Sequence, residues 1–271
     1  MNANEIILYT DMDGTVLSDW SMGPVVPERN LRLIRRFVEA GGCFSVASGR
    51  EAPSILRFFP GVPFKAPLVC SNGAVVYGGT PGRVLRKIPL PGPYKLDCRD
   101  YVLSRPDVWI VAADERAIYQ VLTGDPARDA ALDDLARPRI SMERFLAGDF
   151  VKVVYILPEG GDMEGLKADA ARFPCCDLVI GAQSGPRYYE MVERSVNKAE
   201  GIRCALKAAG LEGRTLVCIG DYFNDWDMLQ AADLSACPDN SPREIQDICQ
   251  IVTCGNNEGA VGDLIEQLHL W

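Results

Sequence analysis

The chain has 271 residues, of which 48% are hydrophobic, which is enough for one large domain or for a core domain that carries a smaller one. Its 28 basic and 37 acidic residues give a formal net charge of -9, which argues against nucleic acid or a membrane surface as a partner and favours a small molecule. No apolar run reaches 18 residues, and the first residues lack the pattern of a secretory signal, so we expect a cytoplasmic protein.

The first elements predict a βαβ unit of an open parallel sheet. Residues 5–10 form a short apolar run typical of a buried strand. Residues 26–42 carry apolar side chains at helical spacing, and residues 43–48 form a second strand. A helix over 51–59 and a strand over 67–72 follow. This strand and helix order indicates an α/β fold.

Residues 83–186 have a different pattern of predicted elements, which indicates an inserted domain. Gly and Pro mark its junctions, and short helices separate strands expected over 107–113, 117–122, 150–157, 176–181 and 188–193. The α/β alternation then returns, with helices expected over 197–210, 224–232, 241–249 and 260–270 and strands over 215–221, 234–238 and 250–254. We therefore predict a discontinuous core of residues 1–82 and 187–271 with a smaller α/β domain between its two parts.

Cysteine and histidine usage limits the possible chemistry. The ten cysteines are scattered without a CxxC pair, which favours free, buried thiols in a reducing compartment. His269, three residues from the end of the sequence, is the only histidine. Acid–base chemistry is therefore expected from carboxylates, or from Lys, Tyr or Cys, rather than from an imidazole.

The first candidate motif follows the first predicted strand. Asp11 and Asp13 lie two residues apart at its carboxyl end, the edge at which ligands bind in open α/β sheets. Two carboxylates this close repel each other unless a cation such as Mg²⁺ or a shared proton relieves them. Gly14 permits a sharp turn, and Thr15 offers a hydroxyl. An aspartate can also attack phosphorus, and an ordinary acidic turn stays open as the alternative explanation of this motif alone.

Two further motifs supply groups that suit an anion. Ser48, Gly49 and Arg50 follow the second predicted strand, where a hydroxyl and free amides suit phosphate oxygens. Lys198 opens a predicted helix, and Asn197 before it is a plausible cap. A lysine at a helix start opposes the helix dipole, which makes a neighbouring anion favourable. A common turn for the first motif and a solvated surface lysine for the second remain the simpler alternatives.

The fourth motif is GDYFNDWDML, residues 220–229. Asp221 ends an apolar strand, and Asn224 and Asp225 follow it closely, so an acidic pair lies at a second strand end and suits a bound Mg²⁺. Helix capping accounts for Asn224 or Asp225 but not for Asp221.

The order and spacing of the four motifs resemble the haloacid dehalogenase superfamily of phosphohydrolases, in particular its Cof-like branch. The matching segments, together with a fifth before the insertion, are DMDGTVL (11–17), VASGR (46–50), SNGAVVY (71–77), NKAEGI (197–202) and GDYFNDWDML. The resemblance implies a Rossmann-like core, and the inserted residues 83–186 match the larger α/β cap of this group, which selects the substrate.

The resemblance also implies roles for the motif residues. Asp11 would accept the phosphoryl group, and Asp13 would act as general acid and then as general base. Mg²⁺ would be held by Asp11, by the backbone carbonyl of Asp13 and by Asp221, with Asp225 acting through water. The remaining groups, which would orient and neutralise the phosphoryl oxygens, are Ser48, Gly49, Lys198 and Asn224.

The leading hypothesis is Mg²⁺-dependent hydrolysis of a small phosphorylated metabolite, a phosphate monoester for which a sugar phosphate is one candidate. Two alternatives stay open: phosphotransfer to a second hydroxyl, as in phosphomutases, and a non-catalytic regulator that binds phosphoryl groups or metal. The sequence does not fix the oligomeric state, and a monomer is compatible with it. In the insertion, polar side chains near predicted strands are expected at the surface: Asp114, Arg116, Tyr119, Arg187 and Tyr188.

Overall fold

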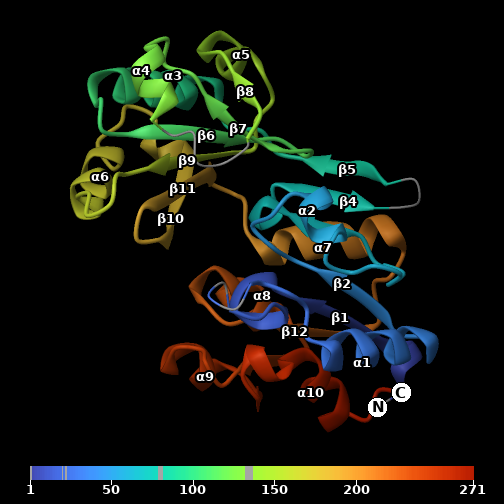
Figure 1. Ribbon diagram of the computed structural model, residues 1–271. Helices are drawn as coiled ribbons and strands as arrows, with labels where there is room; N and C mark the ends of the chain where they lie inside the picture. The colour runs from blue at the N-terminus through green and yellow to red at the C-terminus, as the bar shows by residue number, and fades with distance from the viewer. Residues whose placement is uncertain (1, 20, 22, 79–81, 132–136) are drawn as a thin grey trace. The chain divides into compact units, whose positions relative to one another are not determined.

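The computed structural model describes residues 2–19, 21, 23–78, 82–131 and 137–271. These residues form two compact units (Figure 1). Unit 1 combines Met1–Arg86 with Asn197–Trp271, and unit 2 is Lys87–Val196.

A five-stranded parallel sheet forms the centre of unit 1, in the order β14-β13-β12-β1-β2. Its strands are β1 (Ile6–Thr10), β2 (Cys43–Val46), β12 (Thr215–Ile219), β13 (Leu234–Pro238) and β14 (Ile251–Thr253). Every residue of β1 is buried, as expected for the apolar central strand of a parallel sheet. The predicted parallel α/β core is therefore confirmed.

Helices cover both faces of this sheet (Figure 1). They are α1 (Glu28–Glu39), α2 (Ala52–Leu56), α7 (Lys198–Ala209), α8 (Trp226–Ala231), α9 (Arg243–Ile248) and α10 (Ala260–Gln267). On one side α1 packs against α10, and the buried Asn30 amide joins them by accepting a 2.7 Å hydrogen bond from the Gly262 N–H. On the other side, Ile202 of α7 belongs to one apolar cluster with Ile7 and Tyr9 of β1.

A three-stranded sheet completes unit 1. It consists of β3 (Leu68–Cys70), β4 (Val75–Gly78) and β5 (Arg83–Lys87), in that order. A parallel bridge between Ala47 and Val69 places β3 beside the end of β2. The loop after β2 and the turn after β3 therefore lie next to each other.

Unit 2 is built on a six-stranded sheet in the order β10-β11-β9-β6-β7-β8, in which only the β7–β8 pair is parallel among the pairings described. The strands are β6 (Trp109–Ala113), β7 (Ile118–Val121), β8 (Arg139–Ile140), β9 (Lys152–Ile156), β10 (Val179–Gly185) and β11 (Tyr188–Glu193). The helices are α3 (Gly92–Ser104), α4 (Pro126–Ala130), α5 (Met142–Ala147) and α6 (Met163–Ala170).

The limits of unit 2 differ from the range 83–186 expected for the insertion. β11 lies beyond residue 186, yet it pairs with both β9 and β10, so these ladder hydrogen bonds hold it in the sheet of unit 2. At the other end, β5 belongs to the small sheet of unit 1 up to Arg86. Strand pairing therefore moves both limits later in the chain.

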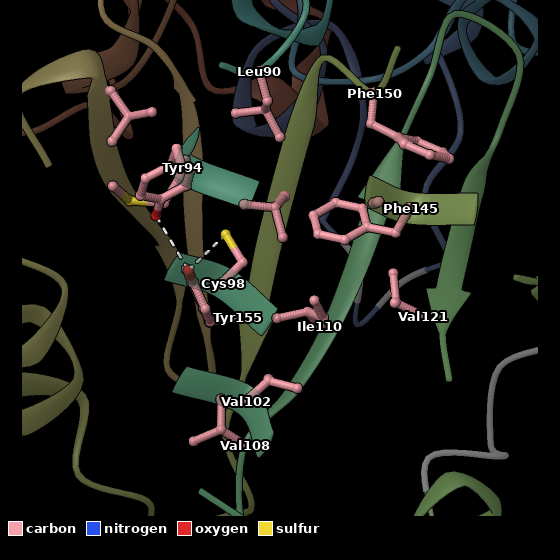
Figure 2. Close-up of a cluster of buried hydrophobic side chains, with 14 of the residues drawn as sticks. Leu90, Tyr94, Cys98, Val102, Val108, Ile110, Val121, Phe145, Phe150 and Tyr155 are labelled. Atoms are coloured by element: carbon pink, nitrogen blue, oxygen red, sulfur yellow. Dashed lines mark hydrogen bonds between the residues drawn. The ribbon is translucent and has the colours of Figure 1, made fainter. Parts of the chain in front are cut away.

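The core of unit 2 contains a buried polar contact among its apolar side chains (Figure 2). The Tyr155 hydroxyl donates a 3.0 Å hydrogen bond to Cys98 Sγ, and the Tyr94 hydroxyl lies 3.2 Å from that of Tyr155. Burial raises the pKa of the Cys98 thiol to about 12, so it stays protonated and unreactive.

All ten cysteines are unpaired, as the sequence predicted. Five are buried and five are partly exposed, so the expected burial holds for half of them. Among the described residues, none of the helices combines the length and the apolar character needed to cross a membrane.

Candidate active site

Asp11 lies at the carboxyl end of β1, next to the end of β12. Its N–H donates a 2.9 Å hydrogen bond to the Ile219 carbonyl, which continues the β1–β12 ladder by one residue. Its side chain is 7% exposed. The central parallel strands thus place a nearly buried carboxylate at the edge where ligands of such sheets bind.

Asp13 has a different ion-pair partner from Asp11, whose side chain binds Lys198. The chain leaves the extended strand after Asp11 and turns at Gly14, whose φ is +77°. The Asp13 carboxylate instead receives two hydrogen bonds from Arg50, from Nε at 2.9 Å and from Nη2 at 2.6 Å. Arg50 therefore neutralises the Asp13 carboxylate, and the expectation that a cation such as Mg²⁺ relieves the pair stays a prediction.

Gly14 and Thr15 bring the turn after β1 against Asp221. A Cβ on Gly14 would stand 2.3 Å from Asp221 Oδ2, so the contact needs glycine as well as its left-handed backbone. The Thr15 hydroxyl donates a 2.8 Å hydrogen bond to Asp221 Oδ1. The Asn240 amide, which follows β13, donates to the Gly14 carbonyl at 3.0 Å. The turn is therefore held from two other strand ends.

Lys198 is the cation at the centre of the site. Asn197 caps α7 by accepting a hydrogen bond from the Glu200 N–H at 2.8 Å, as predicted. The Lys198 ammonium donates to Asp11 Oδ1 at 2.7 Å and to Asp225 Oδ1 at 2.5 Å, and its side chain is completely buried. The alternative of a solvated surface lysine is wrong, because α7 begins at the sheet edge and directs this side chain inward.

Asp225 organises the loop of the fourth motif. Its side chain is fully buried, and Oδ2 accepts hydrogen bonds from the N–H groups of Asp221 at 3.0 Å and Tyr222 at 3.2 Å. Its other oxygen accepts a hydrogen bond from Lys198, so both carboxylate oxygens are bound within this cluster and the side chain does not cap α8. Asn224 is exposed on the same loop.

The electrostatics of the cluster favour an additional cation. Burial, reinforced by the neighbouring Asp225, raises the pKa of Asp11 well above its usual range, and Lys198 only partly opposes this. Burial and Asp225 likewise raise the pKa of Asp221 to about 7. Burial would lower the pKa of Lys198, but Asp11 and Asp225 outweigh it and raise that pKa. One ammonium is therefore shared among more negative charge than it neutralises.

The donor set of the cluster fits Mg²⁺. Asp11, Asp221 and Asp225 each offer a carboxylate oxygen, and these three oxygens lie within 4.8 Å of one another. Hard divalent cations prefer oxygen ligands of this kind. The Asp13 carboxylate is not part of this group, which leaves its backbone carbonyl as the atom it could offer.

The buried Ser48 and the partly exposed Gly49 form a loop beside β3. Ser48 is 1% exposed, and its hydroxyl accepts a 3.3 Å hydrogen bond from the Arg50 N–H. The Ser48 N–H donates to the Val69 carbonyl at 2.9 Å. The loop is thus fixed on the same unit as the carboxylates.

Two contributors were not assigned from the sequence: Arg50, which holds Asp13, and Asn240, which holds the turn at Gly14. Arg50 had a usable signal, since it directly follows the Ser–Gly pair at a strand end. Asn240 had none, because β12 lies between β13 and β1, and only the strand order brings the residues after β13 close to the turn after β1. His269 is placed with its ring against Trp271, at 6.1 Å between centroids.

Unit 2 has a surface cavity of its own, of about 390 Å³. Asp114, Arg116 and Tyr119, three of the polar residues named from the sequence, line it together with Lys87 and Arg144. The expected surface placement holds for Arg116, whose side chain is 81% exposed.

Comparison with known proteins supports the same family. Residues 8–265 match the model of the haloacid dehalogenase-like hydrolases. The chain is 23% identical over 262 residues to the Escherichia coli 5-amino-6-(5-phospho-D-ribitylamino)uracil phosphatase YbjI, covering 97% of this chain and 95% of that protein. It is 23% identical over 280 residues to the E. coli pyridoxal phosphate phosphatase YbhA, covering 96% and 97%. The solved structure of the subclass IIB sugar phosphatase BT4131 superposes with a TM-score of 0.78 at 17% identity, covering 98% and 99%.

Proposed function

The chain belongs to the haloacid dehalogenase-like hydrolase family, and we propose that it hydrolyses a small phosphate monoester through an aspartyl-phosphate on Asp11. It is an enzyme of the phosphatase type, in keeping with the named relatives. Those relatives differ in the alcohol that their names imply, so they support a phosphorylated metabolite as the substrate without choosing one. A sugar phosphate is the first candidate class, in line with the described activity of BT4131.

The observation that carries this proposal is the bond between Asp11 and Lys198. A carboxylate can attack phosphorus only if one oxygen is free and the approaching negative charge is balanced. Lys198 binds Oδ1 of Asp11, which leaves Oδ2 for the attack, and its fixed ammonium would balance charge on the phosphoryl oxygens. Ser48, Gly49 and Asn224 would orient those oxygens.

Asp13 would manage the proton in this scheme. It would first protonate the leaving alcohol and later remove a proton from the water that attacks the phosphorus. Arg50 donates hydrogen bonds to both oxygens of Asp13. It would keep this carboxyl in position through one oxygen while the other oxygen carries the proton.

We propose Mg²⁺ as the cofactor, held by Asp11, Asp221, Asp225 and the Asp13 carbonyl. Their clustered oxygens support this assignment. When bound, the ion would neutralise developing charge on the transferring phosphoryl group.

We propose that the two units have different functions. We assign catalysis to the discontinuous core, expected over 1–82 and 187–271 from the sequence, and substrate selection to the inserted cap. The unpaired cysteines support a reducing compartment such as the cytoplasm.

The decisive test is phosphate release from p-nitrophenyl phosphate, followed by a screen of phosphorylated metabolites. The parent protein should release phosphate with Mg²⁺, and Asp11→Asn should lower the rate by more than about 10⁴-fold because the nucleophile is lost. Asp227→Asn is the matched control, since this exposed aspartate lies nearby on α8 and should leave the rate unchanged. Undiminished turnover by Asp11→Asn contradicts the mechanism, and isomerised sugar phosphate without phosphate release contradicts hydrolysis.

A further inference from the structure

The turn Ser71–Gly73 between β3 and β4 lies between two motifs of the candidate site. Its Asn72 N–H donates a 2.9 Å hydrogen bond to the Ser48 carbonyl, and the Ser71 N–H donates to the Arg50 carbonyl at 3.0 Å. A Cβ on Gly73 would stand 2.1 Å from the carbonyl oxygen of Asn197. The turn therefore contacts both the Ser48 loop and the residue that precedes Lys198.

The backbone of this turn is strained. Ser71 has a φ of +49° and Asn72 a φ of +57°, followed by Gly73 at +107°. A non-glycine residue in the left-handed region is uncommon, and two in succession are unfavourable. Asparagine tolerates this conformation better than most residues, but glycine would tolerate it best. The presence of side chains at both positions needs a reason other than backbone geometry.

The Asn72 carboxamide is packed against Gly49. A Cβ built on Gly49 would stand 3.2 Å from Asn72 Oδ1 and 3.5 Å from Nδ2, so a larger residue at position 49 would displace the amide. The Oδ1 end is buried and has no hydrogen-bond partner within the described residues. A buried polar atom without a partner is unfavourable by about 1–3 kcal/mol, so an asparagine is a poor choice here for stability alone.

We propose that Asn72 is a substrate-binding residue, whose carboxamide donates a hydrogen bond to the phosphoryl group held between the Ser48 loop and Lys198. This rests on the proposed function, because it assigns one more ligand to the same phosphoryl group. The donor for this bond is Nδ2, which is not a buried atom, unlike Oδ1, and which has no hydrogen bond within the described residues. The turn fixes where this donor stands, and Gly49 leaves room for it.

Asn72→Gly separates binding from folding. Glycine suits the left-handed backbone, so the Tm should stay within about 3 °C of the parent value. The kcat/KM for p-nitrophenyl phosphate should nevertheless fall about ten- to a hundredfold, the effect of losing a hydrogen bond to a charged group. His269→Gly is the matched control, because His269 also has a positive φ, of +52°, and lies outside the motifs. It should change neither kcat/KM nor, by more than about 3 °C, the Tm.

Asn72→Asp tests the direction of the hydrogen bond. Aspartate keeps the shape but replaces the donor with a negative charge, so its kcat/KM should fall at least as far as that of Asn72→Gly. Parent-like activity in either variant, with an unchanged Tm, overturns the proposal.

A binding measurement keeps this test independent of turnover. Inorganic phosphate, titrated calorimetrically with Mg²⁺ present, should bind Asn72→Gly about ten- to a hundredfold more weakly than the parent. Equal affinity overturns the role of Asn72 whether or not the parent hydrolyses esters. A parent that binds phosphate in this way but releases none from any ester contradicts only the proposed hydrolysis.

Discussion

At the scale of single residues, the site is organised by which cation neutralises which carboxylate. Lys198 forms buried ion pairs with Asp11 and Asp225, whereas Arg50 forms an ion pair with Asp13, which is nearer to solvent. The two Lys198 pairs and the Arg50 pair contribute differently to stability. A buried charge that loses its partner is costly, whereas the Asp13 side chain is 42% exposed and water can replace much of its pairing.

This difference predicts a large effect of Lys198→Met on stability. Removing the ammonium leaves Asp11 and Asp225 buried without their shared cation, and we expect a loss of about 3–5 kcal/mol in the free energy of unfolding. Urea denaturation in the absence of divalent metal measures it. Lys207→Met, on the exposed side of the same helix, should change it by less than about 0.5 kcal/mol. Similar losses in the two variants would contradict the central role given to Lys198.

The sequence indicated the residue types of this site but not their pairing. Asp11, Asp221 and Asp225 could be named because carboxylates at two strand ends stand out against apolar strands. Their ion-pair partners could not be predicted, because a long side chain such as that of Lys198 or Arg50 can reach several different atoms. Which atoms it meets depends on where its backbone stands. That in turn depends on tertiary contacts.

At the scale of elements, the turns after the strands determine the site more than the strands do. The strands were predictable, because short apolar runs in an α/β rhythm pair in parallel. The limit between the two units was not predictable, because the sequence of β11 does not show which sheet it joins. Only its pairing with β9 and β10 assigns it to unit 2. The turns depend on single residues with special backbone geometry, of which Gly14 is the clearest.

Gly14→Ala should therefore be more damaging than an alanine at another glycine with the same backbone. A methyl group there meets Asp221, whereas Gly61 has a φ of +74° and nothing within 4 Å of its Cβ position. Both variants carry the left-handed strain of about 1–2 kcal/mol, and Gly14→Ala should lose roughly 1–3 kcal/mol more. Denaturation of the pair under identical conditions isolates the contact. Equal losses would mean that the turn moves freely away from Asp221.

At the scale of the whole molecule, the excess negative charge is unevenly distributed. The net charge is -9, and part of this excess is concentrated where burial raises the pKa values of Asp11 and Asp221. When the pKa of a carboxyl is higher in the folded state than in the unfolded state, the free energy of unfolding of the protein decreases as the pH rises from the unfolded pKa to the folded pKa. At neutral pH the metal-free protein therefore retains repulsion that its fold alone does not relieve.

Binding of Mg²⁺ should convert this repulsion into stability. Because the ion binds the folded state, its addition should raise the Tm. The free energy of unfolding should increase with the logarithm of the Mg²⁺ concentration, by about 2.7 kcal/mol at a hundred times the dissociation constant. Differential scanning calorimetry at pH 7.5, with and without MgCl₂ after chelator treatment, measures the shift. NaCl at equal ionic strength is the control for screening, which weakens repulsion without a specific binding site. Asp221→Asn should raise the Tm of the metal-free protein, because it removes one repelling charge. It should also reduce the increase in Tm that Mg²⁺ causes. The control Asp227→Asn, at an exposed position, should show the same Mg²⁺-dependent increase as the parent protein. If Asp221 is a ligand of Mg²⁺, removing its charge must weaken binding of the ion to the folded state. An Asp221→Asn protein that keeps the full Mg²⁺-dependent Tm shift would therefore show that the stabilising ion binds elsewhere.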